Sequence, residues 1–240
     1  MWNPASRLVR LPLKLVPDMT VPILSGPLAG KRWRSRSGTH GCWLGTYEAD
    51  LQRQLAAVLN PHDVFYDVGA NVGFFSLLAA SRGARVIAFE PLARNADLFD
   101  RNLQLNRIAS ATLVRCAVGR HEGMARFKSG ASASMGRLSR EGDVEVPVTA
   151  LDAFLAAGRA PAPTVIKMDI EGAESEALAG ARSLLQAHRP LLFLSTHGWK
   201  QHEACRAALQ DMGYRLDLRR DGASDGQYEL TARHPGDSAG

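Results

Sequence analysis

Cysteine is scarce in this sequence, and the three cysteines share no spacing typical of a metal site with one another or with histidines. Their number is odd, and they lie far apart at Cys42, Cys116 and Cys205. Such a set argues against a disulfide framework and against a structural zinc site. We therefore expect three ordinary thiols in a reducing compartment.

Long apolar runs are also missing. Pro12, Pro17 and Pro22 interrupt every apolar stretch near the N-terminus, and no uncharged span is long enough to cross a bilayer. A signal peptide would need a continuous apolar core and a small-residue cleavage site, and the sequence has neither. We expect no transmembrane segment and a cytoplasmic location.

Acidic residues are nearly absent from the first 36 positions, where Asp18 alone stands against seven lysines and arginines. This segment accounts for the whole net charge of +5, so the rest of the chain is close to neutral. A basic head would suit an acidic substrate, an anionic membrane face or nucleic acid, or it is only a solvated leader. Because no basic patch is interleaved with aromatic residues, nucleic acid is disfavoured as a partner.

The chain contains no internal repeat, and its composition favours one domain with an extension. Residues 1–45 are rich in turn formers and predict a basic, irregular extension that packs on the core through Trp33 and Trp43. Residues 46–240 are expected to form the domain proper. It should begin with a helix over 46–59, for which Thr46 is the expected N-cap.

From Val64 onward, segments with the character of strands and helices alternate. This alternation predicts a parallel sheet covered by helices on both faces, an α/β architecture. The last two strands, within 214–233, are joined by a short turn and must pair antiparallel. A short hairpin and a small helix are expected between 123 and 155. The other expected strands are 64–70, 85–91, 111–119, 164–170 and 190–196, and the main helices are 74–82, 93–106, 172–188 and 199–213.

The stretch "FYDVGANVGFFS" runs from a strand through a glycine turn into a helix. Gly69 and Gly73 allow the backbone to turn sharply and to approach a ligand, and the helix N-terminus attracts negative groups. The spacing D-x-G-x-N-x-G differs from the G-x-G-x-x-G that binds a pyrophosphate. Asp67 would repel phosphates but could hold an ammonium group, so the turn favours a ligand with an amino-acid end.

Glu90 ends the next strand, in "VIAFEP". An acid at this point can accept hydrogen bonds from both hydroxyls of a ribose. Together, the glycine turn and Glu90 indicate a ligand that has both a ribose and an amino-acid end. S-adenosylmethionine fits this description. A nicotinamide-dependent dehydrogenase is disfavoured by the glycine spacing and by the final antiparallel hairpin.

On "GTYEADLQ", "FYDVGANVGFF", "AFEPLARNADLFDRNLQLN" and "IKMDIEGAESEAL", the sequence resembles class I S-adenosylmethionine-dependent methyltransferases and, more narrowly, the FkbM family. The resemblance implies a Rossmann-like three-layer sandwich with a seven-stranded, mostly parallel sheet of order 3-2-1-4-5-7-6, in which strand 7 is antiparallel. It also implies an O-methyltransferase that acts on hydroxyls of sugars, glycans or secondary metabolites. Two alternatives remain: methylation of a macromolecule such as RNA or protein, and a cofactor-binding module without turnover.

The resemblance also implies residue roles. The methionine end of the cofactor is expected at the glycine turn, the ribose at Glu90 and the adenine beside Ala117 and Val118. One departure concerns Ser195, where the family often has a glutamate, so a catalytic carboxylate is not expected there. The implied cofactor-binding residues are Asp67, Gly69, Ala70, Asn71, Gly73, Glu90, Pro91, Ala117, Val118 and Asp169.

The catalytic candidates are Asp169, Glu171 and His197. Asp169 ends a buried strand and should point into the site, and Glu171 shares its face if the strand persists. His197 is preferred as general base because an unperturbed imidazole titrates near neutral pH. These three side chains could hold magnesium or manganese, but hydrogen bonding without a metal is favoured.

The remaining candidates are weaker. For Glu174, a role in helix capping and a role in the site are equally expected, and Glu176 is expected to be exposed. His40 is a distant second choice as base and is expected to pack near Trp43. The polar loop over 128–140 could contact a substrate or lie free on the surface.

Overall fold

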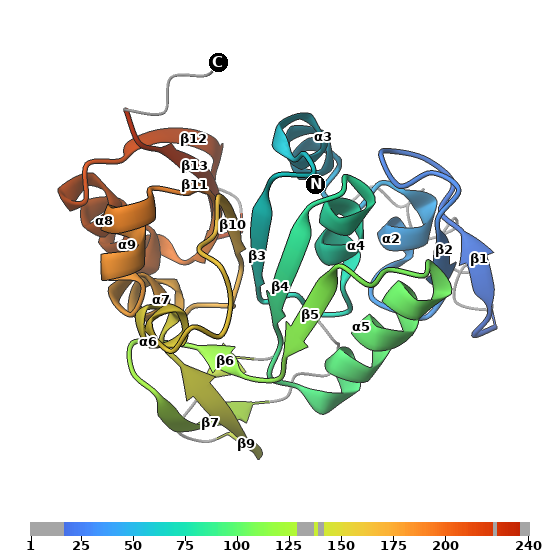
Figure 1. The fold of residues 1–240 in the computed structure, drawn as a ribbon, viewed down its shortest axis with the longest axis horizontal. Helices are drawn as coiled ribbons and strands as arrows, with labels where there is room; N and C mark the ends of the chain where they lie inside the picture. Colours follow the sequence, from blue (N-terminus) through green and yellow to red (C-terminus); the bar gives the residue numbers. More distant parts are fainter. Residues whose placement is uncertain (1–16, 129–136, 139–141, 223–224, 236–240) are drawn as a thin grey trace.

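The computed structural model describes residues 17–128, 137–138, 142–222 and 225–235. Its centre is a seven-stranded sheet, and two layers of helices cover the two faces (Figure 1). Most of the polar loop, at 129–136 and 139–141, lies outside the described residues, as does the basic stretch 1–16. No helix within the described part of the chain is long and apolar enough to span a bilayer.

The strand order confirms the predicted fold class. Read from the other edge, the order β5-β4-β3-β10-β11-β13-β12 is the class I order 3-2-1-4-5-7-6. The strand β13 pairs antiparallel with both neighbours, whereas β10, β3, β4 and β5 pair in parallel. The strands are β3 (Val64–Val68), β4 (Arg85–Phe89), β5 (Ala111–Val114), β10 (Val165–Met168), β11 (Leu191–His197), β12 (Arg215–Asp221) and β13 (Gln227–Arg233).

Burial on both faces explains why the central strands are almost continuously apolar. In β3, Phe65 points into one core, whereas Tyr66 and Val68 point into the other. The first core is closed by α3 (Ala49–Val58), α4 (Phe74–Ser81) and α5 (Ala93–Leu105). The second is closed by α6 (Leu151–Ala156), α7 (Glu174–Ala179), α8 (Arg182–His188) and α9 (Trp199–Asp211). The three cysteines are buried free thiols.

The single strand expected over 111–119 is wrong. The chain leaves β5 at Arg115, and the amide of Cys116 donates to the carbonyl of Val114 (2.9 Å) in a tight turn. The next strand, β6 (Ala117–Val118), then pairs in parallel with β9 in a separate sheet. The predicted hairpin is confirmed by the antiparallel pairing of β7 with the next strand along the chain, β8, and β9 pairs antiparallel with the other side of β7. This small sheet consists of β6, β9 (Val144–Thr149), β7 (Gly123–Lys128) and β8 (Arg137–Leu138).

The single helix expected from Gly172 to His188 is also wrong, because the chain breaks between α7 and α8. A Cβ at Gly180 would lie 2.2 Å from the carbonyl oxygen of Gly119. The carboxylate of Asp152 accepts hydrogen bonds from the amides of Ser183 and Leu184 (3.0 and 2.8 Å). Gly119 and Asp152 both lie outside the predicted helix, so helical periodicity alone does not reveal the break.

The described part of the N-terminal extension is more regular than expected. It forms a hairpin of β1 (Thr20–Pro22) and β2 (Arg32–Arg34), followed by the short helix α2 (His40–Leu44). Ile23, Leu28 and Trp33 are buried in the first core. Thr46 is not an N-cap, since α3 begins at Ala49 and Glu48 occupies the cap position. The domain boundary at residue 45 stays a prediction.

Two asparagines of α5 attach this extension to the domain. The side chain of Asn106 accepts from the amide of Arg32 (2.8 Å) and donates to its carbonyl (2.7 Å), as a neighbouring strand would. Asn102 donates to the carbonyl of Val72 (2.9 Å) and to the hydroxyl of Ser37 (2.7 Å). Asn102 therefore links the extension directly to the glycine turn after β3.

We expect Asn102→Ala to lower the free energy of unfolding by about 2 kcal/mol, because it leaves the buried carbonyl of Val72 and the buried hydroxyl of Ser37 without this partner. The measurement is urea denaturation followed by circular dichroism. Gln104→Ala on the exposed side of the same helix is the control and should change stability by less than about 0.5 kcal/mol. Equal effects of the two substitutions would contradict the linking role of Asn102.

Candidate active site

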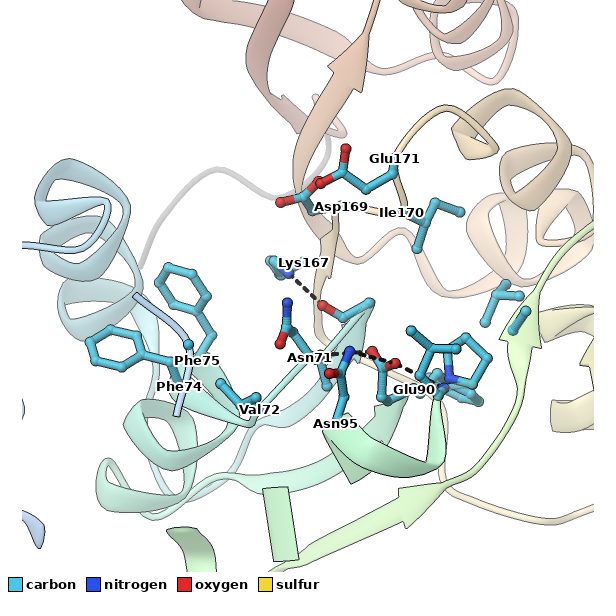
Figure 2. Close-up of a pocket in the computed structure, with 18 of the residues that line it drawn as sticks. Asn71, Val72, Phe74, Phe75, Glu90, Asn95, Lys167, Asp169, Ile170 and Glu171 are labelled. Atoms are coloured by element: carbon cyan, nitrogen blue, oxygen red, sulfur yellow. Dashed lines mark hydrogen bonds between the residues drawn. The ribbon is translucent and has the colours of Figure 1, made fainter. Parts of the chain in front are cut away.

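A cavity of about 170 Å³ lies beyond the carboxyl ends of β3, β4 and β10 (Figure 2). Since β3 has β4 on one side and β10 on the other, the chain connections run in opposite directions from this point, where open α/β sheets bind ligands. Of the predicted cofactor-binding residues, Asp67 and Gly73 lie outside the lining. Those in the lining are Gly69, Ala70, Asn71, Glu90, Pro91, Ala117, Val118 and Asp169.

Close packing requires glycine at both ends of the glycine turn. Gly69 has φ 81°, and a Cβ there would lie 1.9 Å from the carbonyl oxygen of Asp169. Gly73 has φ 88°, and its Cβ would lie 2.7 Å from the ring of Phe99. Asn71 between them also adopts a left-handed conformation, with φ 50°. The turn therefore lies directly against the segment that follows β10.

Glu90 is held in place by hydrogen bonds from its surroundings. Its Oε1 accepts from the amide of Leu92 (3.0 Å) and from Nδ2 of Asn95 (3.1 Å), and its Oε2 accepts from the amide of Asn71 (3.0 Å). The residue is 5% exposed, and burial raises the pKa of its carboxyl group although these hydrogen bonds oppose the rise. The result is an oriented, desolvated carboxylate at the edge of the cavity.

Asp67 is fully buried and paired within the protein. Its Oδ2 accepts from the hydroxyl of Ser76 (2.7 Å), and its Oδ1 lies 3.5 Å from Nζ of Lys167. Lys167 also donates to the carbonyl of Gly69 (3.0 Å) and lines the cavity. Burial opposes its charge, but Asp67, Asp169 and Glu48 raise its pKa above the ordinary value. In this structure, the ammonium group beside Asp67 is that of Lys167.

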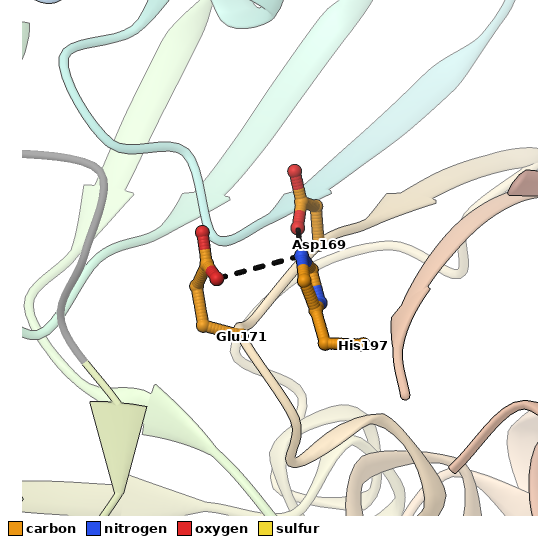
Figure 3. A group of neighbouring side chains, drawn as sticks. All are labelled: Asp169, Glu171 and His197. Atoms are coloured by element: carbon orange, nitrogen blue, oxygen red, sulfur yellow. Dashed lines mark ion pairs between the residues drawn. The ribbon is translucent and has the colours of Figure 1, made fainter. Parts of the chain in front are cut away.

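Asp169, Glu171 and His197 lie together (Figure 3). Asp169 and Glu171 line the cavity, whereas His197 lies behind them and is not part of its lining. The Nε2 atom of His197 is 3.4 Å from Oε2 of Glu171 and 3.7 Å from Oδ1 of Asp169. The expectation that the strand persists to Glu171 is wrong, because β10 ends at Met168. Glu171 reaches the cluster through a left-handed turn, with φ 57° followed by Gly172 at 104°.

Glu174 orients the histidine. Its side chain is fully buried, and its Oε1 lies 3.1 Å from Nδ1 of His197 and accepts from the amide of Gly172 (3.0 Å). Burial alone would lower the pKa of His197, but the hydrogen bond to Glu174 and the charges of Asp169 and Glu171 raise it to about 9. The imidazole is therefore charged at neutral pH, which removes the reason for preferring it as general base. Its catalytic role stays a prediction.

Several residues of the site are absent from the sequence-based set. Lys167 could have been found, since a lysine inside the apolar strand "VIKM" requires an internal partner. No spacing signal marks the other wall, which comes from the extension and the start of α3. There, the ring of Tyr47 packs edge-on against Phe74 at 5.5 Å. The lining residues from this region are Gly38, Thr39, Cys42 and Tyr47.

The structure also places the weaker candidates from the sequence. Glu176 is exposed and paired with Arg120, as expected. The indole of Trp43 donates to Nδ1 of His40 (3.2 Å), so His40 does pack near this tryptophan. Ser195 is buried in β11, opposite Glu229 of β13.

The raised pKa of His197 predicts a pH-dependent contribution to stability. A folded value of about 9 lies above the ordinary 6.5, so the stabilisation is complete below pH 6.5 and is lost as the pH rises through about 9. We expect the difference in unfolding free energy between wild type and His197→Gln to shrink over this range. Denaturant titrations of both proteins at several pH values, in the presence of a chelator, measure this difference. A difference in unfolding free energy that does not change with pH would contradict the charged imidazole.

Comparisons with known proteins agree with this geometry. Residues 67–216 match the Methyltransferase FkbM domain. The hexuronic acid methyltransferase AglP of Haloferax volcanii is 33% identical over 144 residues, which cover 58% of this chain and 59% of that protein. Methyltransferase 1 of Beauveria bassiana is 26% identical over 149 residues, which cover 50% of this chain and 59% of that protein.

Among solved structures, a methyltransferase FkbM from Methylobacillus flagellatus superposes with a TM-score of 0.52 at 23% identity, over 72% of this chain and 44% of that one. This likeness supports the fold. The chain spans less than two thirds of the length of each of these three proteins. The family match covers more than half of the 240 residues and includes both the glycine turn and the acidic cluster. The chain therefore belongs to the FkbM methyltransferase family.

Proposed function

We propose that this protein transfers the methyl group of S-adenosylmethionine to a hydroxyl group of a sugar, a glycan or a secondary metabolite. The observation that carries the proposal is the arrangement of acids around one cavity. Glu90 lies at the carboxyl end of β4, and Asp169 and Glu171 follow β10. A ligand that carries a diol and a positively charged amino-acid end would be recognised by acids placed in this way.

The walls of the cavity suit the parts of this donor. Glu90 is oriented to accept hydrogen bonds from the ribose hydroxyls, and Ala117 and Val118 offer an apolar surface to the adenine. The sulfonium and ammonium groups of the donor are positively charged. Asp169 and the partly exposed Glu171 would stabilise these charges.

The reaction would be an in-line displacement. The acceptor oxygen forms a bond to the methyl carbon, the carbon–sulfur bond breaks, and its electron pair stays on the sulfur of S-adenosylhomocysteine. Holding donor and acceptor in line supplies much of the rate. The acceptor must also lose its hydroxyl proton. Burial raises the pKa of both Asp169 and Glu171, which makes them better proton acceptors than ordinary carboxylates.

The class of acceptor is supported by the comparison with the Haloferax protein, which is named a hexuronic acid methyltransferase. A sugar acid presents several hydroxyl groups and one carboxylate, so it combines the hydroxyl and the acidic character expected of the substrate. The cytoplasmic location stays a prediction.

Calorimetry and methyl transfer test the proposal in two steps. S-adenosylhomocysteine should bind to the purified protein, and NAD should not. With S-adenosylmethionine radiolabelled on the methyl group, label should then appear on uronic acids or on glycans that contain them. Binding of NAD in place of S-adenosylhomocysteine would refute the assigned donor, and label that appears only on RNA or protein would refute the assigned acceptor class.

We expect Glu90→Gln to weaken the binding of S-adenosylhomocysteine at least about tenfold, because an amide cannot accept hydrogen bonds from both ribose hydroxyls as strongly as a carboxylate. Isothermal titration calorimetry measures the change. Glu176→Gln, an exposed glutamate on α7, is the matched control and should bind like wild type. Unchanged affinity in Glu90→Gln would remove the ribose assignment.

A further inference from the structure

We propose that Asp169, Glu171 and His197 form a binding site for one divalent cation. One donor atom from each side chain lies within 4.8 Å of the other two. The distances from Nε2 of His197 to the two carboxylate oxygens are 3.4 and 3.7 Å (Figure 3). Ligand atoms around an octahedral ion with bonds of about 2.1 Å lie roughly 3 Å apart. A small contraction of the side chains would therefore complete the site.

The histidine is already oriented as a metal ligand requires, and the ion would displace the proton that Nε2 carries in the charged imidazole. Glu174 is fully buried and holds Nδ1 of His197 at 3.1 Å, which directs Nε2 toward Asp169 and Glu171. A carboxylate on the far nitrogen of a ligating histidine sets its tautomer and ring orientation and makes it a stronger ligand. The same Glu174 oxygen accepts from the amide of Gly172, so it also fixes the turn that presents Glu171.

An oxygen without a hydrogen-bond partner points to a missing cation. Oδ1 of Asp169 is buried and accepts no hydrogen bond from the residues that the structure describes. It is also the oxygen that faces Nε2 of His197. Oε2 of the fully buried Glu174 likewise has no hydrogen-bond partner in the described part of the chain. A buried carboxylate oxygen without a hydrogen-bond partner costs free energy, and a bound cation would give Oδ1 of Asp169 a direct partner.

The charges around the cavity lead to the same conclusion. Among the described residues that interact here, carboxylates outnumber cations, and a bound S-adenosylmethionine adds only one net positive charge. An acceptor with a carboxylate of its own would be repelled unless a further cation were present. The carboxylates are Glu48, Asp67, Glu90, Asp169, Glu171 and Glu174, and the cations are Lys167 and, before an ion displaces its Nε2 proton, His197.

The ligand set selects the kind of ion. Two carboxylate oxygens and one imidazole suit Mn²⁺ or Mg²⁺ rather than an ion that prefers sulfur. Asp169 and Glu171 both line the cavity, so the open positions of the ion would face a bound acceptor. With the ion bound, Asp169 and Glu171 would act as its ligands and no longer as proton acceptors, and a hydroxyl oxygen on the ion would release its proton to solvent more easily before it takes the methyl group. This last step rests on the proposed function, whereas binding of the ion does not.

Electron paramagnetic resonance with Mn²⁺ tests the site, because the signal of the free ion disappears on binding. We expect one Mn²⁺ per chain in the wild type, at least about tenfold weaker binding in Glu171→Gln, and a loss of about 10- to 100-fold in Glu174→Gln. Glu171 is 38% exposed, so its substitution should leave the fold intact. Glu176→Gln on the same segment is the control and should bind Mn²⁺ like wild type.

Two results would overturn the inference: no bound Mn²⁺ in the wild type at a concentration of about 1 mM, or equal affinity in wild type and Glu171→Gln. Calorimetry with S-adenosylhomocysteine on the same samples separates this inference from the proposed function. If the nucleoside product binds and Mn²⁺ does not, only the metal site is refuted. If Mn²⁺ binds and the nucleoside product does not, the metal site stands and the assigned donor fails.

Discussion

A backbone contact between two neighbouring strands determines where the site lies. The strands β3 and β10 run in parallel, and the amide of Asp169 donates to the carbonyl of Val68 (3.0 Å) as the last link between them. Immediately beyond, the carbonyl of Asp169 occupies the space that a side chain at position 69 would need. Only glycine permits this approach. Because the contact joins the glycine turn to the acidic turn, it brings groups from two distant parts of the sequence into the lining of one cavity.

The buried charges beside this contact are organised around two cations. Lys167 interacts with Asp67, the carbonyl of Gly69 and Asp169, and His197 interacts with Asp169, Glu171 and Glu174. Asp169 belongs to both groups, so it connects the turn that would hold the donor with the cluster that would act on the acceptor. Isolated carboxylates would be costly at this depth, and the two cations stabilise them through charge and hydrogen bonds. The polar side chains of the site are thereby oriented before a ligand arrives.

The N-terminal extension takes part in this arrangement. The segment from Gly38 to Tyr47 supplies one wall of the cavity, although the match to the FkbM domain begins only at residue 67. The extension is held by Trp33 in the first core and by the asparagines Asn102 and Asn106 of α5. Asn102 also donates to the carbonyl of Val72, so the same side chain holds both the extension and the glycine turn in place. The basic head is thus continuous with a segment that shapes the site.

The sequence by itself determined the alternation of the main strands and helices after Val64, and it placed Glu90 and Asp169 at the carboxyl edge of the sheet. Hydrophobic periodicity reports local structure, and the carboxyl ends of parallel strands necessarily meet at one edge of a sheet. Only the tertiary structure decided the break at Gly180, the pairing of Lys167 with Asp67, the wall at Tyr47 and the charged state of His197. Each of these depends on atoms that are remote in sequence and adjacent in space. Periodicity and spacing show which face of an element is buried, but they do not show which residues lie opposite that face.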